Sequence, residues 1–502
     1  MIEANLPLLV PLTFLIPALL IPLIGIRVPG AAYPLALAAV LVSIPLAGFG
    51  LFRVIAGGPV SYTLGGWEAP IGIELVLDPL ASFLTLVVTV VSCLVLIHAR
   101  QVASVEHPDK RVPYYSLVLL LLAGFCGILS TGDLFNLYVF LEISSLAGYG
   151  LVAIGDKRAP VSAYRYLILG SVGTGFYLLG IGFIYVMSGS LNMADLARIL
   201  PHILDQPPVL AGLILTVTGI GVKTALFPLH FWLPDAYSSA SSASSALLAP
   251  LGTKVGAYIL IRVLFFVFDP DEVEQRVPIT TIIAWMSAAG ILYGSLMALA
   301  QQELKRMLAY SSIAQIGYIG LGLGMATPLG FTGAVLHILN HAVMKAALFL
   351  VAGNLRVQLG HSNIAAMDQR LSRQMPWSMA AFVVAALSMI GLPPTAGFFS
   401  KWYLVLGGIQ GSYWVFVAVI LLGGLLNTLY FFRVVERVYL PMRRGRSDPA
   451  VANGGREIVE SGEARLFMLA PTLVLAGLLL ALGLASSFLV NRVIHLMIPA
   501  GL

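Results

Sequence analysis

The sequence predicts an all-α polytopic membrane protein with about fourteen transmembrane helices. Hydrophobic residues occupy 59% of its 502 positions and charged residues only 10%, whereas a soluble domain carries roughly 25% charged residues. The apolar residues form runs of about 20, the length that spans a bilayer core. Lysine and arginine gather in alternate connections between these runs. Most of the surface is therefore expected to face lipid.

Fourteen apolar segments are the predicted helices. In order, they span residues 6–26, 33–52, 79–99, 114–131, 133–154, 161–187, 209–229, 243–266, 278–300, 307–325, 329–355, 378–405, 411–433 and 467–490. The first segment is interpreted as a membrane helix rather than a cleaved signal peptide. Glu3 precedes it without a basic residue, and its apolar stretch is longer than that of a typical signal peptide.

Basic residues predict the orientation of the chain. The connections with even numbers, counted from the N-terminus, hold only Arg53, Arg198, Arg262 and Arg276. Most other lysines and arginines lie in the odd-numbered connections, above all in the long connection 434–466. The positive-inside rule places those connections in the cytoplasm and both termini on the periplasmic side of the inner membrane. The net charge of +5 then reflects topology, and nucleic-acid binding is not expected.

No chemistry is predicted for the chain itself. Cys93 and Cys126 lie inside apolar runs, which suits neither a disulfide framework nor a metal site. No phosphate-binding loop or nucleophile triad is visible in the sequence, so neither a catalytic residue nor a cofactor or metal is expected. Whether the chain serves as the ion-translocating subunit of a redox-driven enzyme is left open.

Five ionisable residues lie inside the predicted helices. They are Glu142, Lys223, Lys254, Lys345 and Lys401. An ionised side chain at the bilayer centre costs at least about 2.5–3.5 kcal/mol on insertion scales. One such residue could be a snorkelling lysine or a structural ion pair, but five favour a polar pathway across the membrane. A buried lysine suits proton transfer, because burial disfavours its charged form and a nearby carboxylate restores it.

Three polar residues follow helical spacing in the eleventh segment. His337, His341 and Lys345 are four residues apart, so they are expected on one helix face. Histidine titrates near neutral pH and can relay protons. This face is interpreted as the lining of a channel, and three unrelated polar contacts are the alternative.

Prolines are expected to interrupt two of the predicted helices. The seventh contains Pro228 and Pro234, and the twelfth contains Pro393 and Pro394. Proline removes a backbone donor and breaks a helix, and a lysine lies beside each predicted break. Irregular backbone at membrane depth survives where protein or water covers it, as in inverted-repeat transporters.

Helices seven and twelve are five apart, which fits two inverted repeats of five helices each. The predicted division is 1–112 for helices 1–3, 113–268 for the first repeat, 277–440 for the second repeat, and 441–502 for a cytoplasmic loop and helix 14.

Five stretches of the sequence resemble a known family. They are GDLFNLYVFLEISSLAGY (132–149), VKTALFPLHFWLPDAY (222–237), ELKRMLAYSSIAQIGY (303–318), HILNHAVMKAALFL (337–350) and GLPPTAGFFSKW (391–402). The family is that of the antiporter-like membrane subunits shared by Mrp-type multisubunit sodium/proton antiporters, respiratory complex I and membrane-bound hydrogenases. Lys401 looks similar to the Mrp-type D subunit or to the smallest complex I relative, and the stretch GDLFNLYVFLE looks more like the D subunit.

The resemblance implies fourteen helices, inverted repeats and broken helices 7 and 12. It implies a proton route in which Glu142 pairs with Lys223, Lys254 connects the two halves and Lys401 belongs to the second half-channel. His337, His341 and Lys345 match the polar eleventh helix of the family, and His230 matches the histidine at the seventh helix break. After Asp235 and Ala236 the family commonly has histidine, whereas this chain has Tyr237 and a run rich in serine and alanine.

The sequence leaves two roles open for Lys401. Its half of the chain has no mid-helix acid, so Lys401 is expected to release a proton readily at the exit of the route. The alternative is that it only binds backbone carbonyls freed at the break between Gly391 and Gly397.

The expected function is that of a proton-translocating subunit of a multisubunit cation/proton antiporter. The expected partners are other hydrophobic subunits, the lipid bilayer, and protons with or without sodium or another monovalent cation. The alternatives are a proton-pumping subunit of a complex I-like or hydrogenase-type redox complex, or of an inorganic-carbon uptake complex, and a stand-alone secondary transporter. An inert scaffold would not need five intramembrane ionisable groups.

Overall fold

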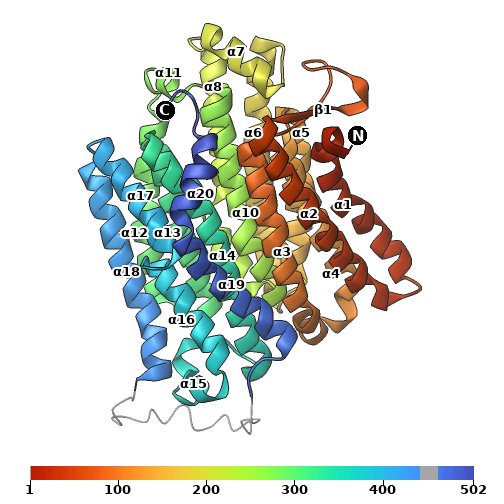
Figure 1. The fold of residues 1–502 in the computed structure, drawn as a ribbon, viewed down its shortest axis with the longest axis vertical. Helices are drawn as coiled ribbons and strands as arrows, with labels where there is room; N and C mark the ends of the chain where they lie inside the picture. The colour runs from red at the N-terminus through yellow and green to blue at the C-terminus, as the bar shows by residue number, and fades with distance from the viewer. Residues whose placement is uncertain (1, 441–461) are drawn as a thin grey trace.

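The computed structural model describes residues 2–440 and 462–502. Most of the predicted connection 434–466, with its expected cytoplasmic location, therefore lies outside the described residues. Figure 1 shows long helices that run side by side along the longest axis of the molecule. The all-α membrane fold that the sequence predicts is confirmed.

Each predicted span contains a long helix or, in the twelfth span, two half-helices. They are α1 (Ile2–Gly25), α2 (Ala32–Gly57), α3 (Pro79–Glu106), α4 (Arg111–Ser130), α5 (Leu134–Ala153), α6 (Ala159–Ser188), α8 (Pro207–Thr224), α10 (Ser242–Arg262), α12 (Ile279–Ala300), α13 (Leu304–Gly324), α14 (Pro328–Leu359), α16 (Pro376–Ile390), α17 (Ala396–Gln410), α18 (Trp414–Tyr439) and α19 (Leu466–Leu484). Among the described residues, 12 helices are long and apolar enough to cross a membrane. These do not include α13, α16 or α17, so the count of fourteen stays a prediction.

Shorter elements occupy the ends of the bundle. They are the antiparallel strands β1 (Val60–Thr63) and β2 (Glu74–Leu77), the helices α7 (Met193–Ile203), α9 (Leu233–Ser239), α11 (Pro270–Glu274), α15 (Arg370–Gln374) and α20 (Ser486–Arg492), and several turns of 3-10 or π-helix. The sequence did not predict these elements. In Figure 1, β1, α7 and α11 lie at the same end as both chain termini, and α15 lies at the other end. An even number of membrane passes follows.

Side-chain caps fix the start of α5 and α10. Asp133 accepts a hydrogen bond from the backbone of Asn136 at the start of α5, and Ser241 accepts one from Ser244 at the start of α10. Such caps satisfy donors that a helix start leaves unpaired. These caps fix the residues at which α5 and α10 begin, and they therefore set the depth of Glu142 and Lys254 within the bundle.

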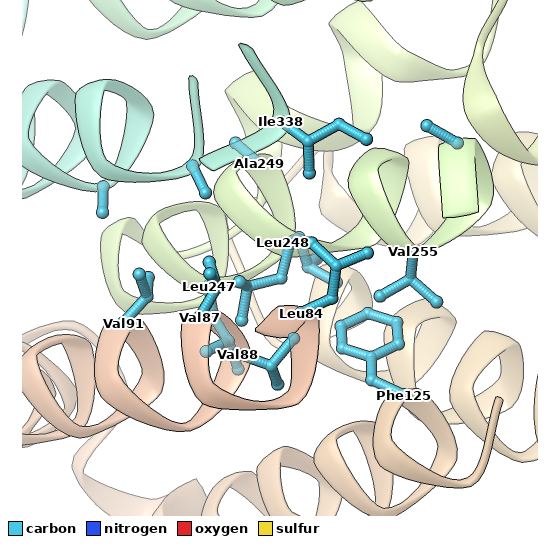
Figure 2. Packing of buried hydrophobic residues seen from close by; sticks show 14 of the residues in the cluster. Leu84, Val87, Val88, Val91, Phe125, Leu247, Leu248, Ala249, Val255 and Ile338 are labelled. Atoms are coloured by element: carbon cyan, nitrogen blue, oxygen red, sulfur yellow. The ribbon is translucent and has the colours of Figure 1, made fainter. Parts of the chain in front are cut away.

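The centre of the bundle is formed by α10 and α14. In the apolar window of α14 100% of residues are buried, and in that of α10 89%, whereas the figure is 33% for α1, α2 and α18. Figure 2 shows the packing of Leu84 from α3, Phe125 from α4, Val255 from α10 and Ile338 from α14. Polar side chains on α10 and α14 are therefore enclosed by protein rather than by lipid.

Two equivalent backbone contacts support the predicted inverted repeats. Asp133, just before α5, pairs with Asn192 after α6, and Glu303, just before α13, pairs with Asn363 after α14. Backbone hydrogen bonds of 2.8–2.9 Å flank both pairs in the same pattern. The first pair precedes α7 and the second precedes α15, which lie at opposite ends of the bundle (Figure 1). The boundaries 113–268 and 277–440 stay predictions.

Candidate functional site

The first predicted break is present between α8 and α9. Helix α8 ends at Thr224, because Ala225 adopts a left-handed conformation with φ of 58°. Pro228 follows in the non-helical segment, and Pro234 lies in the first turn of α9, where a missing N–H costs nothing. The helix therefore ends at Thr224 rather than at residue 229, the end predicted from the apolar run. The discontinuous seventh helix is confirmed.

Lys223 lies in the last turn of α8 and is buried. Its Nζ donates to the Ser145 hydroxyl at 2.7 Å and to the Tyr149 hydroxyl at 3.1 Å, both on α5. The carbonyl end of α8 also favours a cation here. Lys223 is thus held by neutral hydroxyls and a helix end.

The predicted direct pairing of Glu142 with Lys223 is not observed. Among the described residues, no ion pair within 4.0 Å joins the two, and Glu142 Oε1 is buried without a hydrogen-bond partner. Glu142, Ser145 and Tyr149 have the spacing i, i+3, i+7 and share one face of α5. Because Ser145 and Tyr149 reach the ammonium, Glu142 acts on Lys223 only electrostatically, from one turn away.

A small cavity separates Lys223 from α10. Its volume is about 30 Å³, and Ser145, Lys223, Tyr237 and Gly252 contribute to its lining. About 10–15 Å³ of such space suffices for one water molecule. Water can therefore bridge the first buried lysine and the helix that carries Lys254.

Lys254 lies between the two halves of the chain. It is 3% exposed, and its Nζ donates to the Ala249 carbonyl at 2.7 Å and contacts Thr253 Oγ1 at 3.3 Å. Its helix, α10, packs against α14, which carries His341 and Lys345. This position fits a connecting role between the halves.

His337, His341 and Lys345 lie on one face of α14, as their spacing predicts, and this face points towards α13 and α17. His337, bonded through Nε2 to Gln315 Oε1 of α13 at 3.0 Å, contacts the Ser400 hydroxyl of α17 through Nδ1 at 2.9 Å. His341 stacks on His337 at 5.9 Å between ring centres. Neither nitrogen of His341 has a hydrogen-bond partner among the described residues, although the ring is fully buried. Buried polar groups of this kind ordinarily bind water.

Lys345 completes this face one turn further along α14. Its Nζ donates to the Leu308 carbonyl at 2.7 Å and to the Ser311 hydroxyl at 2.5 Å. Both partners belong to α13, and all three residues are fully buried. In the part of the chain that the structure describes, no carboxylate lies within ion-pair distance of the Lys345 ammonium.

The second predicted break is present between α16 and α17. Gly391 adopts a φ of 92° after α16, and Pro393 and Pro394 lie in the five residues before α17. Lys401 Nζ donates to the carbonyls of Met389 (2.8 Å) and Ile390 (3.0 Å), in the last turn of α16. These contacts are those expected from the alternative in which Lys401 binds freed carbonyls.

Among the described residues, no hydrogen bond or ring contact joins His230 to the predicted lysines or to the histidines of α14. Its ring lies 5.4 Å from that of Phe227 and 5.0 Å from that of Tyr293 on α12. Its Nδ1 is buried without a partner among the described residues. The structure places it in an aromatic cluster rather than beside Lys223.

Sequence reasoning missed several polar partners of the predicted residues. They are Ser145, Tyr149, Ser311, Gln315 and Ser400. All five lie in or next to the stretches that carry the family resemblance. Helical spacing from Glu142 would have identified Ser145 and Tyr149 in advance. Within the residues described, no cluster of three or more histidine, cysteine or acidic side chains could hold a metal ion.

Comparison with known proteins places this chain in a family. The family described as "NADH:quinone oxidoreductase/Mrp antiporter, TM" matches residues 131–427. The chain is 48% identical over 449 residues to NADH-quinone oxidoreductase subunit N of Desulforudis audaxviator, with 89% of each chain covered. It is 35% identical over 396 residues to the D subunit of the Na(+)/H(+) antiporter of Alkalihalophilus pseudofirmus, with 78% of each covered.

A solved structure supports the same assignment. A chain of the Mrp complex from Dietzia sp. superposes with a TM-score of 0.87 at 26% identity, over 99% of this chain and 97% of that one. The chain therefore belongs to the family of antiporter-like membrane subunits that the Mrp antiporters share with NADH:quinone oxidoreductase.

Proposed function

We propose that this chain is the proton-translocating, antiporter-like subunit of a multisubunit cation/proton antiporter in the cell membrane. The observation that carries the proposal is a series of buried basic side chains between the two helix breaks. The series comprises Lys223, Lys254, His341, Lys345, His337 and Lys401. The D subunits of sodium/proton antiporters are relatives of this chain, and partner subunits are expected to surround it.

The contacts of this series suit proton transfer. Burial disfavours an ammonium, so each lysine can exist as a neutral amine when no carboxylate holds its charge. Hydroxyls such as those of Ser145 and Ser311 both donate and accept hydrogen bonds, and the cavity beside Lys223 has room for water. A proton can therefore move from group to group, with Glu142 setting the charge of Lys223.

A second candidate function is that of a proton-pumping membrane subunit in a complex I-like redox complex. The 48% identity to a subunit named NADH-quinone oxidoreductase subunit N favours it. In that case partner subunits would supply the redox chemistry, and this chain would contribute the same series of buried groups. Purification separates the candidates, because the co-purifying subunits would be either small antiporter subunits or redox proteins.

The Glu142→Gln variant tests the proposed function. Glutamine keeps the size of the side chain and removes its charge. In vesicles containing the assembled complex, pH-driven cation transport should be abolished for the most part, while assembly is unchanged. Glu68→Gln is the matched control, because Glu68 is exposed at the β1–β2 connection. Nearly normal transport in Glu142→Gln would make Glu142 a packing residue.

The proposal includes an orientation in which both termini lie outside. Single cysteines in place of Lys110, between α3 and α4, and of Arg198, on α7, would report opposite ends of the bundle. The native Cys93 and Cys126 are buried and give little background. A membrane-impermeant thiol reagent should label only the Arg198→Cys variant in intact cells, and labelling of only the Lys110→Cys variant would reverse the orientation.

A further inference from the structure

A charged cavity of about 600 Å³ lies at the end of the bundle where α9 meets α10. Asp156, Asp235, Ser239, Glu303 and Arg306 are among the residues that line it. The carboxylate of Asp235 already binds Arg306 and Arg165, each at 3.0 Å. The cavity thus has room for water and is lined by paired charges. It lies next to the short break between Ser239, the end of α9, and Ser242, the start of α10.

Lys305 lies directly behind this cavity. Glu303, two residues before it, and Arg306, the next residue, contribute to the cavity wall, whereas Lys305 itself is 0% exposed. Its Nζ donates to the carbonyl of Ala240 in the break, at 2.5 Å. From the sequence, Lys305 was assigned to a connection. The structure makes it another buried lysine.

The charge of Lys305 has no direct partner among the described residues. No carboxylate lies within 4.0 Å of its ammonium. Glu106, Glu303 and Asp156 act on it from a longer distance, but Glu106 and Asp156 bind Arg356, at 3.5 and 2.5 Å, and Glu303 accepts a hydrogen bond from Ser362. A buried ammonium held by one backbone carbonyl is expensive, which is unusual for a purely structural residue at a solvent-facing end.

One side of α13 carries three polar side chains and begins at Lys305. Ser311 and Gln315 follow it at i+6 and i+10. The Leu308 carbonyl and the Ser311 hydroxyl bind Lys345, as described above.

Beyond Ser311 the contacts continue to the second break. Gln315 binds His337, which contacts Ser400, the residue before Lys401. The series from the cavity to Lys401 includes neither Lys223 nor Lys254.

We propose that Lys305 takes up protons from this cavity and passes them along α13 to Lys345, which gives the second half of the chain its own proton supply. The inference rests on the proposed function. The Lys305 ammonium, after its flexible stem leaves the Ala240 carbonyl, loses a proton and becomes a neutral amine. The neutral amine of Lys345 gains that proton through the Ser311 hydroxyl or water. A proton from the cavity then restores Lys305.

A matched pair of variants, Lys305→His and Lys305→Gln, tests the inference. Both side chains can donate a hydrogen bond to the Ala240 carbonyl, but only histidine carries a transferable proton. Lys110→Gln is the control, because Lys110 is an exposed lysine outside the cavity. The measurements are the yield of assembled complex and pH-driven transport in vesicles.

We expect all three variants to assemble. Transport should fall about 100-fold in Lys305→Gln, the low end of the effect of removing one proton-transfer group. Lys305→His should keep a clear fraction of activity, and Lys110→Gln should match the wild type.

Equal transport in the histidine and glutamine variants, or full transport in Lys305→Gln, would overturn the inference. Failure of both variants to assemble would also overturn it, because Lys305 would then serve to hold the α9–α10 break. A wild-type complex that moves no protons would instead refute the proposed function, and this inference with it.

Discussion

The two helix breaks place their lysines in different surroundings. Lys223 precedes its break and binds the hydroxyls of Ser145 and Tyr149 on a neighbouring helix. Lys401 follows its break and binds the last carbonyls of α16, on the other half of its own broken helix. A carboxylate, Glu142, lies one turn from the contacts of Lys223, whereas no acidic residue occurs in α16 or α17.

This difference shows that equivalent helix breaks need not place their lysines among equivalent hydrogen-bond partners. A hydroxyl can donate or accept, so the partners of Lys223 remain satisfied whether the lysine is charged or neutral. Both lysines lie at the carbonyl end of a helix, which favours a cation, but a carbonyl only accepts hydrogen bonds. Lys223 is therefore suited to exchange a proton under the control of Glu142, whereas the two carbonyls that bind Lys401 cannot donate a hydrogen bond to its neutral amine.

The largest effect is expected at the first break. Lys223→Gln removes the ammonium that binds Ser145 and Tyr149, so pH-driven transport in vesicles should fall more than about 100-fold, since a positioned proton-transfer group contributes about 10²–10⁴-fold. Assembly should be unchanged, since glutamine can still hydrogen-bond to both hydroxyls. Transport close to the wild-type rate would remove Lys223 from the pathway and leave the first break a structural feature.

A second effect concerns how tightly the second break is packed. A Cβ added at Gly397 would lie 1.8 Å from the Ser388 carbonyl oxygen, so the half-helices α16 and α17 must separate. Overpacking of this kind costs about 1–3 kcal/mol or more, and Gly397→Ala should lower the yield of assembled complex. Gly175→Ala on α6, where nothing lies within 4 Å, should assemble normally. Equal yields would mean that the break adapts easily.

The smallest effect is expected when one partner of Lys223 is removed at a time. Tyr149→Phe and Ser145→Ala each leave the other hydroxyl bound, so each should lower transport only a few-fold. The double variant should lose more than the product of the two single effects, because both hydroxyls serve one ammonium. Strictly multiplicative effects would show that the two hydroxyls act independently.

The long apolar elements and both breaks could be predicted from the sequence. Apolar runs of bilayer length are dictated by lipid, and Pro228 and Pro393 lie in the non-helical segments that follow α8 and α16. By contrast α7, which begins at Met193, and the β1–β2 pair were missed because neither is an apolar run of that length. They are connections whose structure depends on neighbours distant in sequence.

Most of the buried titratable residues could be predicted from the sequence, but their contacts could not. Burial of Lys305 could not be read from its place beside Arg306, since it depends on the Ala240 carbonyl of another helix. The expected ion pair of Glu142 with Lys223 failed for a related reason. Residues one turn apart on α5 share a face, and only packing decides which of them reaches the ammonium.

Lys401 offers the most direct test of a proton route between the two breaks. Lys401→Glu retains a titratable group, whereas Lys401→Gln retains only hydrogen bonding. In vesicles containing the assembled complex, Lys401→Glu should keep part of the pH-driven transport and Lys401→Gln should lose it. Equal activity in the two variants would contradict a relay through Lys401 and leave it the single role of binding the carbonyls of Met389 and Ile390.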